Sequence, residues 1–211
     1  MSAVWFTSDL HIGHEKVAQY RAAEAQAVLP RHVGAEVDWH DRTLARNWDT
    51  MIAPADQVWV LGDISSGTKD GQLNALQWIS ERPGEKHLIA GNHDSCHPIR
   101  RDSHKWQPTY LEVFASVQLA AKRRIPLSDG HVTAVLSHLP YIGDHSGVDR
   151  YPEWRLRDAG HYLLHGHTHE GCAMNAALHP RQIHVGVDAW GLDPVPLETI
   201  QALVRRLEGD L

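Results

Sequence analysis

The sequence predicts a single α/β domain built around one mixed β-sheet or a pair of sheets. Strand and helix patterns alternate through the first half of the chain, and strand patterns dominate the second half. The 211 residues, 42 % of them hydrophobic, are enough for one well-cored domain but short for two. We find no linker, low-complexity segment or internal repeat, so residues 1–211 are expected to form one domain.

Hydrophobic periodicity places the elements along the chain. Apolar and β-branched runs predict strands or extended segments over 4–8, 57–61, 87–90, 111–121, 132–137, 162–164 and 183–187. Helical patterns cover 15–28, 70–81 and 197–207. A further helix carries Trp39, Leu44, Trp48 and Ile52 on one face, and Asp38 is its expected N-cap residue.

Five short polar clusters stand where predicted strands end. In chain order they are Asp9-Leu10-His11, Gly62-Asp63, Gly91-Asn92-His93-Asp94, Ser137-His138 and Gly166-His167-Thr168-His169. Open α/β sheets bind ligands in a crevice at the carboxyl ends of their strands, so the five clusters can converge there. Asp, Asn and His side chains are oxygen and nitrogen donors that suit manganese, iron, zinc and similar divalent ions. Together the clusters predict one two-metal centre that cleaves phosphate esters.

The spacing inside the clusters supports this interpretation. Side chains two residues apart on a strand share a face, so Asp9 and His11 point the same way, as do His167 and His169. Glycines at 62, 91 and 166 permit tight turns and close approach of a neighbouring backbone. Capping of a turn explains any one of these polar residues equally well, because Asp and Asn are common in turns. It does not explain five clusters in this order.

The clusters and their order resemble those of the calcineurin-like metallophosphoesterases, and the resemblance extends from Ser8 to about Pro196. It implies a four-layer αββα sandwich, in which two mixed β-sheets pack face to face with helices outside. It also implies two metal sites that share Asp63. The first is formed by residues matching Asp9, His11, Asp63 and His169. The second is formed by residues matching Asp63, Asn92, His138 and His167.

The same resemblance assigns the catalytic residues. His93 matches the residue that contacts the phosphate and assists departure of the leaving group, and Asp94 matches the residue that orients it. Asn92 is expected to contact the substrate as well as a metal ion. On chemical grounds alone, His93 can donate a proton to the leaving oxygen if Asp94 or a backbone group fixes its tautomer. Two divalent ions about 4 Å apart can generate a hydroxide near neutral pH, neutralise the phosphate oxygens and hold the attack in line.

Two further residues are candidates for binding substrate. His14 follows the first cluster, in a sequence similar to that of small bacterial and phage members of the family. It is expected either at the rim of the site or as a helix cap. The polar segment 141–157 lies between two ligand-bearing strands and is expected to cover the cleft. Its Arg150 or Arg155 is expected to pair with a phosphate oxygen, with a surface salt bridge as the equal alternative.

Most other histidines and tryptophans are expected to be structural. The chain has 17 histidines, and among them His165 is expected to be structural or to support a metal ligand. The eight tryptophans are expected mainly in the core. Trp154 and Trp190 lie beside loops of the site, so stacking on a nucleobase is the alternative for these two.

Composition and net charge limit the kinds of partner that the protein is expected to bind. The N-terminus lacks the pattern of a secretory signal, and no run reaches the roughly 20 apolar residues that cross a membrane, so a soluble, cytoplasmic protein without a membrane partner is expected. The formal net charge of −6 argues against extended nucleic acid as a partner. Two bound divalent ions would still make the pocket locally attractive to phosphate.

We therefore expect a hydrolase, namely a phosphodiesterase acting on nucleotide-type or other small phosphodiesters, with some monoesterase activity. The alternatives are a phosphomonoesterase or phosphoprotein phosphatase and, less favoured, a non-catalytic scaffold of the same fold. Retention of Asn92, His93 and Asp94 counts against the scaffold. The expected cofactors are two divalent metal ions, with manganese first and iron, zinc, nickel or cobalt as alternatives.

Overall fold

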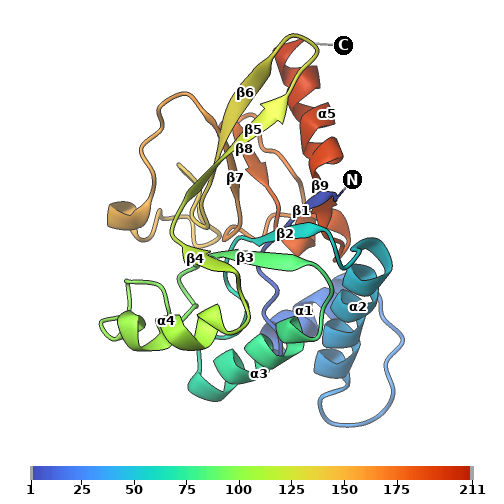
Figure 1. Cartoon of the computed structure of the whole chain (residues 1–211). Helices are drawn as coiled ribbons and strands as arrows, with labels where there is room; N and C mark the ends of the chain where they lie inside the picture. The colour runs from blue at the N-terminus through green and yellow to red at the C-terminus, as the bar shows by residue number, and fades with distance from the viewer. Residues whose placement is uncertain (1, 210–211) are drawn as a thin grey trace.

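The computed structural model describes residues 2–209, which form two mixed β-sheets (Figure 1). The first sheet has the order β4-β3-β2-β1-β9, from Ser116–Gln118, Glu85–Ile89, Gln57–Val60, Val4–Thr7 and Val195–Pro196. The second has the order β5-β6-β7-β8, from Ala121–Pro126, His131–Leu136, Tyr162–His165 and Gln182–His184. The outer strands β9 and β5 pair antiparallel, and the other pairings are parallel.

Helices flank the sheets on two sides. Those beside the first sheet are α1 (Glu15–Glu24), α2 (Ala35–Met51), α3 (Lys69–Ser80) and α4 (Ser103–Leu111), which lie below it in Figure 1. Helix α5 (Leu197–Glu208) contacts β1, β5 and β9 and therefore lies against strands of both sheets. The expected arrangement of two mixed sheets flanked by helices is confirmed. No helix within residues 2–209 combines the length and apolar character needed to cross a membrane.

Two hydrophobic cores hold these layers together. The first core lies between the first sheet and its helices and contains Trp48 of α2 and Ile79 of α3. The second core joins side chains of both sheets with the buried face of α5. Strand β2 shows why both cores form: Val58 belongs to the first core and Trp59 to the second, because side chains alternate along a strand. The first sheet is therefore covered on both faces, as parallel sheets usually are.

Two expectations about local structure are wrong. Helix α2 begins at Ala35, and its N-cap is Gly34, in the left-handed conformation with φ of 86°, rather than Asp38. Asp38 lies in the first turn instead, where its negative charge faces the positive end of the helix dipole. The segment 111–121 is not continuously extended, because α4 includes Leu111 and contains Pro108. Burial of Tyr110 in the first core supports this short helix despite its proline.

Trp48→Ala is expected to lower the free energy of unfolding by about 3–5 kcal/mol, because it empties a large buried site. Trp48 is 2 % exposed, and its indole nitrogen donates to the carbonyl of Pro83 at 3.0 Å. Urea titration followed by circular dichroism measures the change. Leu73→Ala, at a position 41 % exposed on the neighbouring helix α3, is the control. Equal losses in both variants would contradict the placement of Trp48 in the first core.

Candidate metal centre

The five polar clusters meet where the parallel strands of both sheets end. Strands β1, β2 and β3 lead into the first three clusters, and β6 and β7 lead into the last two. An isolated parallel bridge between Ser8 and Gly186 joins the two sheets at this edge. The crevice that the sequence predicted at the carboxyl ends of the strands is therefore built from both sheets.

The backbone is sharply bent at the expected metal ligands. Five of them have positive φ angles, between 48° and 72°, namely Asp9, His11, Asp63, His167 and His169. This left-handed region is sparsely populated by residues other than glycine and costs of order 1 kcal/mol or more at each position. Main-chain hydrogen bonds hold the bends in place, with the nitrogens of Asp9 and His11 each donating to the loop after β2 at 3.0 Å. Such strain is typical of binding sites.

Two glycines allow the ligand loops to approach one another closely. A Cβ atom on Gly62 would lie 2.6 Å from the Cα atom of Gly91. A Cβ atom on Gly166 would overlap the hydroxyl of Ser8 and lie 2.5 Å from a carboxylate oxygen of Asp9. The close backbone approach expected from the sequence is confirmed at Gly62, whereas the neighbours of Gly166 are side-chain atoms of Ser8 and Asp9. A larger residue at either position would push the loops apart.

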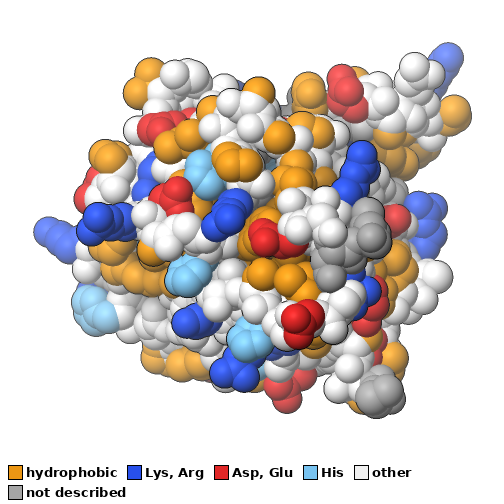
Figure 2. Space-filling model, turned by 90° about the horizontal axis from the view of Figure 1, so that it is seen from above, with side chains coloured by type: hydrophobic (Ala, Val, Ile, Leu, Met, Phe, Trp, Pro, Cys, Tyr) orange, Lys and Arg blue, Asp and Glu red, His pale blue; other side chains and the backbone are white. Residues whose placement is uncertain are grey.

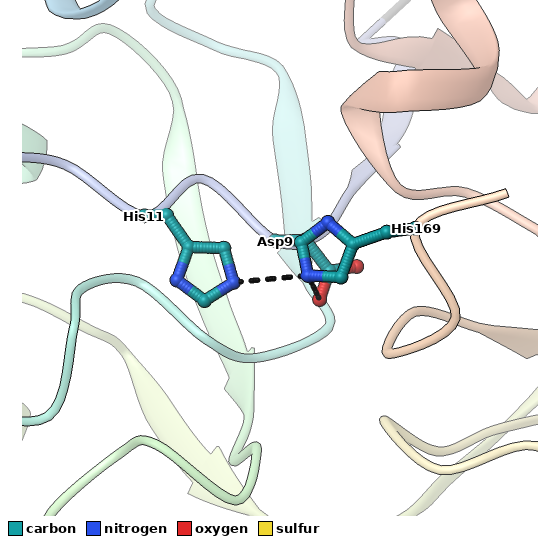
Figure 3. A group of neighbouring side chains, drawn as sticks. All are labelled: Asp9, His11 and His169. Carbon is teal, nitrogen blue, oxygen red and sulfur yellow. Dashed lines mark hydrogen bonds and ion pairs between the residues drawn. The ribbon is translucent and has the colours of Figure 1, made fainter. Parts of the chain in front are cut away.

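The first donor set gathers around facing imidazole nitrogens (Figure 3). The Nε2 atoms of His11 and His169 lie 3.3 Å apart, and that of His169 lies 4.0 Å from Asp9 Oδ1. His11 Nε2 is also 3.9 Å from Asp63 Oδ2. Burial lowers the pKa of His11 to about 3 against the opposing pull of Asp63, which keeps the ring in its neutral, metal-binding form. The donor atoms of Asp9, His11 and His169 lie close together, with Asp63 beside His11, and this set of nitrogen and oxygen donors fits a divalent cation.

The second donor set faces the same oxygen of the Asp63 carboxyl group as the first. His138 Nε2 lies 3.4 Å from Asp63 Oδ2 and 3.1 Å from Asn92 Oδ1. The ring of His167 lies beside that of His138, with centroids 5.3 Å apart, and its donor atom groups with those of His138 and Asp63. The structure thus brings together all seven residues expected as ligands, with Asp63 in both sets. This donor chemistry fits two neighbouring divalent ions.

His138 would lose a proton when a metal ion binds. Burial alone would lower its pKa, but the adjacent Asp63 carboxylate outweighs burial and raises the pKa of His138 to about 10. The ring donates from Nδ1 to the carbonyl of Leu61 at 2.7 Å, so the nitrogen facing the site is Nε2. A cation must therefore displace the proton on Nε2.

Two carboxylates that sequence reasoning did not assign support the histidines of the last cluster. Asp144 contacts His167 Nε2 at 2.7 Å, which leaves Nδ1 to face the donor set. Asp188 contacts His169 Nδ1 at 2.9 Å, which leaves Nε2 to face the other set. Such carboxylates fix the tautomer and raise the basicity of metal-binding histidines. The available signals were a carboxylate directly after the predicted strand 183–187 and the polar segment 141–157.

Arg21 of α1 is a further residue that the sequence did not single out. It is 4 % exposed, and it donates to both carboxylate oxygens of Asp188 at 2.7 Å. It also donates to the carbonyls of Asp9 at 2.8 Å and Leu10 at 3.3 Å. The guanidinium thus joins the loop of the first cluster to the carboxylate behind His169. An arginine on the same helix face as the buried Ala18 was its only sequence signal.

His93 lies beside the first donor set, and a backbone group fixes its ring. The ring is half-buried and edge-on to that of His11, with centroids 5.6 Å apart. His93 Nδ1 lies 3.2 Å from the carbonyl oxygen of Ser66, so it donates there and leaves Nε2 to face the site. The main-chain nitrogen of His93 donates to Asp63 Oδ1 at 2.8 Å.

Asp94 has a different role from the one the resemblance implies. Its carboxylate accepts hydrogen bonds from the main-chain nitrogens of Gly91, Asp63 and Ile64, at 2.7, 3.0 and 3.0 Å. It therefore fastens two ligand loops together and orients His93 through the backbone instead of holding its ring. Burial and the neighbouring Asp63 raise the pKa of Asp94 to about 7, while the three amide donors favour its ionised form.

His14 occupies the N-cap position of α1 and faces the site. Its side chain makes no capping hydrogen bond, and its ring is edge-on to His11 with centroids 5.4 Å apart. Of the two roles that the sequence left open, this geometry favours the rim of the site.

Arg150 forms an ion pair, which is one of the two roles considered for it. Its guanidinium forms an ion pair with Asp144 at 3.0 Å and lies 3.3 Å from His167 Nε2. The side chain remains 34 % exposed, so it can also meet a substrate beside the second donor set. Arg155 is 6 % exposed and donates to the carbonyls of Pro140 and Gly143, which makes it a structural residue of this segment.

The two tryptophans considered for stacking have other contacts. Trp190 packs against the second core, and its indole nitrogen donates to the carbonyl of His184. Trp154 lies edge-on to His97, with ring centroids 5.2 Å apart. His165 is buried and bonds through Nδ1 to the carbonyl of Gly166, which agrees with the structural role expected for it.

Comparison with known proteins decides the family. Residues 2–171 match the calcineurin-like phosphoesterases, and this range includes every expected metal ligand. The chain belongs to the calcineurin-like phosphoesterase family. Together with the His and Asp donor groups, membership supports a metal-dependent phosphoesterase, a hydrolase of phosphate esters.

Similar proteins occur in mycobacteriophages. The gene 66 protein of Mycobacterium phage L5 is 50 % identical over 194 residues, covering 90 % of this chain and 89 % of that protein. The gene 66 protein of phage D29 is 47 % identical over 216 residues and covers both chains fully. A solved structure of a protein of unknown function from Aquifex aeolicus is 22 % identical with a TM-score of 0.64, covering 96 % of this phosphoesterase and 100 % of that chain. That likeness shows a shared fold.

Asp144→Asn is expected to weaken binding of one of the two metal ions about 10- to 100-fold, because His167 loses the carboxylate that fixes its tautomer. Isothermal titration with Mn²⁺ measures both sites of this phosphoesterase. Glu153→Gln removes an exposed carboxylate of the same segment and is the matched control. Two unchanged affinities in Asp144→Asn would refute the supporting role of this carboxylate.

Metal affinity is expected to rise with pH. His138 carries a proton below its pKa of about 10 in the metal-free protein, and only its neutral form binds metal. Affinity at the second site should therefore increase about tenfold per pH unit between pH 6 and 9 beyond any change at the first site. Titrations with Mn²⁺ in buffers of different ionisation enthalpy count the released protons. Binding without proton release at pH 7 would contradict the raised pKa.

Proposed function

We propose that this phosphoesterase is a phosphodiesterase that acts on nucleotide-type or other small phosphodiesters, with some monoesterase activity. The observation that carries the proposal is the sharing of Asp63 by two donor sets, with His93 beside one set and Arg150 beside the other. When bound, the metal ions would neutralise phosphate oxygens and lower the pKa of water. The residues around them would place the ester and supply a proton.

His93 is the group we assign to the leaving oxygen. Its Nδ1 is engaged by the carbonyl of Ser66, so a proton on Nε2 can be given to the departing alkoxide. Asn92 would contact a substrate oxygen as well as the second metal ion, since its amide lies in that donor set. His14 would contact the ester from the rim beside His11.

Charge around the site favours a diester. The exposed part of Arg150 can donate to one phosphate oxygen, but its positive charge is already paired with Asp144. Apart from the metal ions, the centre therefore offers little unpaired positive charge for the second negative charge of a monoester. A phosphomonoesterase or phosphoprotein phosphatase remains the alternative that substrate comparison tests.

We propose manganese as the metal, with iron, zinc, nickel and cobalt as alternatives, because the donor set contains nitrogen and oxygen but no thiolate. We propose a small phosphoester, rather than extended nucleic acid, as the partner. Basic and acidic side chains are interspersed on the face seen in Figure 2, where no continuous basic surface is visible. The net charge of −6 supports the same choice.

The Mn²⁺-loaded protein is expected to hydrolyse bis-para-nitrophenyl phosphate with a higher kcat/KM than para-nitrophenyl phosphate. His93→Ala should lower kcat for the diester about 10²- to 10⁴-fold through loss of the acid, with the metal content unchanged. Asp63→Ala should abolish turnover and metal binding together. His104→Ala, on the exposed side of α4, is the control. Unchanged turnover in either test variant would refute the two-metal mechanism, and a wide preference for the monoester would reverse the substrate order.

A further inference from the structure

A cavity of about 310 Å³ borders the first donor set. It lies between α1, α2 and the loop that follows β8. His169 and Asp188 are among its lining residues, so the cavity shares His169 with the first donor set. A phosphoester held at the metal ions therefore has a compartment beside it for the group attached to the phosphate.

The walls of this cavity suit a planar ring. Tyr20 and Trp39 contribute aromatic side chains, and Val187 and Leu192 contribute aliphatic ones. Tyr20 is 61 % exposed, so a large part of its side chain is left uncovered by the rest of the protein. Cavities of this size with apolar walls and few polar groups are typical sites for small organic molecules. Aromatic side chains add stacking to the burial of such a ring.

The charges in the cavity disfavour a second phosphate. Arg21 is the positive group of the lining, and both oxygens of Asp188 already accept hydrogen bonds from it. Glu24 also lines the cavity, and its carboxylate has no hydrogen-bond or ion-pair partner among residues 2–209. The unpaired charge is therefore negative. A neutral ring that carries N–H donors fits such a compartment better than an anionic group does.

We propose that this cavity binds the nucleobase of a nucleotide-type phosphoester while the phosphate lies at the metal centre. Tyr20 and Trp39 supply the stacking surface, and Glu24 accepts a hydrogen bond from an exocyclic amino group. The inference rests on the proposed function and names the substrate class of the same site. It assigns base recognition to α1 and α2, and Trp154 and Trp190 take no part in it.

Two variants test the cavity from opposite directions. Thr43→Trp fills it from α2, and Tyr20→Ala removes its exposed aromatic wall. Isothermal titration of the Mn²⁺-loaded protein with adenosine monophosphate and with inorganic phosphate gives the ratio of the two affinities. In the unmodified protein the nucleotide should bind at least about tenfold more tightly than phosphate. Each variant should weaken binding of the nucleotide but not of phosphate, so that the two affinities become similar. Thermal unfolding followed by circular dichroism shows that the variants fold, and Leu73→Ala on α3 is the matched surface control.

The amino-group contact has its own test. Inosine monophosphate carries an oxygen where adenosine monophosphate carries the amino group, so Glu24 should favour the adenine nucleotide. Glu24→Gln should reduce that preference. Equal affinities for adenosine monophosphate and phosphate in the unmodified protein, or a ratio unmoved by both Thr43→Trp and Tyr20→Ala, would overturn the proposal. Failure of the proposed function is separate, because it would appear as no hydrolysis of bis-para-nitrophenyl phosphate by the Mn²⁺-loaded protein.

Discussion

A single buried carboxyl group, that of Asp63, is the point on which both donor sets and three ligand loops depend. One oxygen accepts a hydrogen bond from the main-chain nitrogen of His93 at 2.8 Å. The other lies 3.4 Å from Nε2 of His138 and 3.9 Å from Nε2 of His11. The group is 2 % exposed, and burying a charge is costly unless it is paired. Its anionic form is kept by its neighbours, because burial raises the pKa of Asp63 but the adjacent histidines, led by His138, lower it well below its usual range. The centre is thus built around a buried negative charge, which a bound cation would neutralise.

The two histidines of the last cluster are supported in the same way. Behind His167 stands Asp144, which is paired with Arg150. Behind His169 stands Asp188, which is paired with Arg21. Each chain of imidazole, carboxylate and guanidinium fixes a tautomer and balances the charge of the carboxylate inside the protein. The arginines come from α1 and from the segment 141–157, so elements outside the sheets also determine the orientation of the ligands.

The sequence allowed the fold class and the residues of the centre to be predicted, because strand ends and donor types are local features. Asp9 and His11 could be placed together from their spacing, and His138 from the strand before it. Arg21 and Asp188 could not be paired in advance, since 167 residues separate them and only the packing of α1 against the sheet edge joins them. The helix around Pro108 was missed for a similar reason, because burial of Tyr110 outweighs the local preference. Local patterns were therefore enough to predict the donor residues. The residues that hold those donors in place depend on long-range packing and could not be predicted.

The same packing changes where substrate recognition is to be sought. From sequence, the segment 141–157 is expected to contact the substrate, since it lies between two ligand-bearing strands. In the structure the side chain of its Asp144 has no exposed surface and bonds to His167, an expected metal ligand, and to the guanidinium groups of Arg150 and Arg155. A segment held so firmly supports the centre, and beside the last two histidines it presents the exposed parts of His145 and Arg150. The opposite side of the centre, between α1 and α2, keeps an uncovered tyrosine and an unpaired carboxylate beside a cavity. Groups without partners in the protein are the ones left free to recognise a ligand, so α1 and α2 become the elements to compare when substrate preference differs between related proteins.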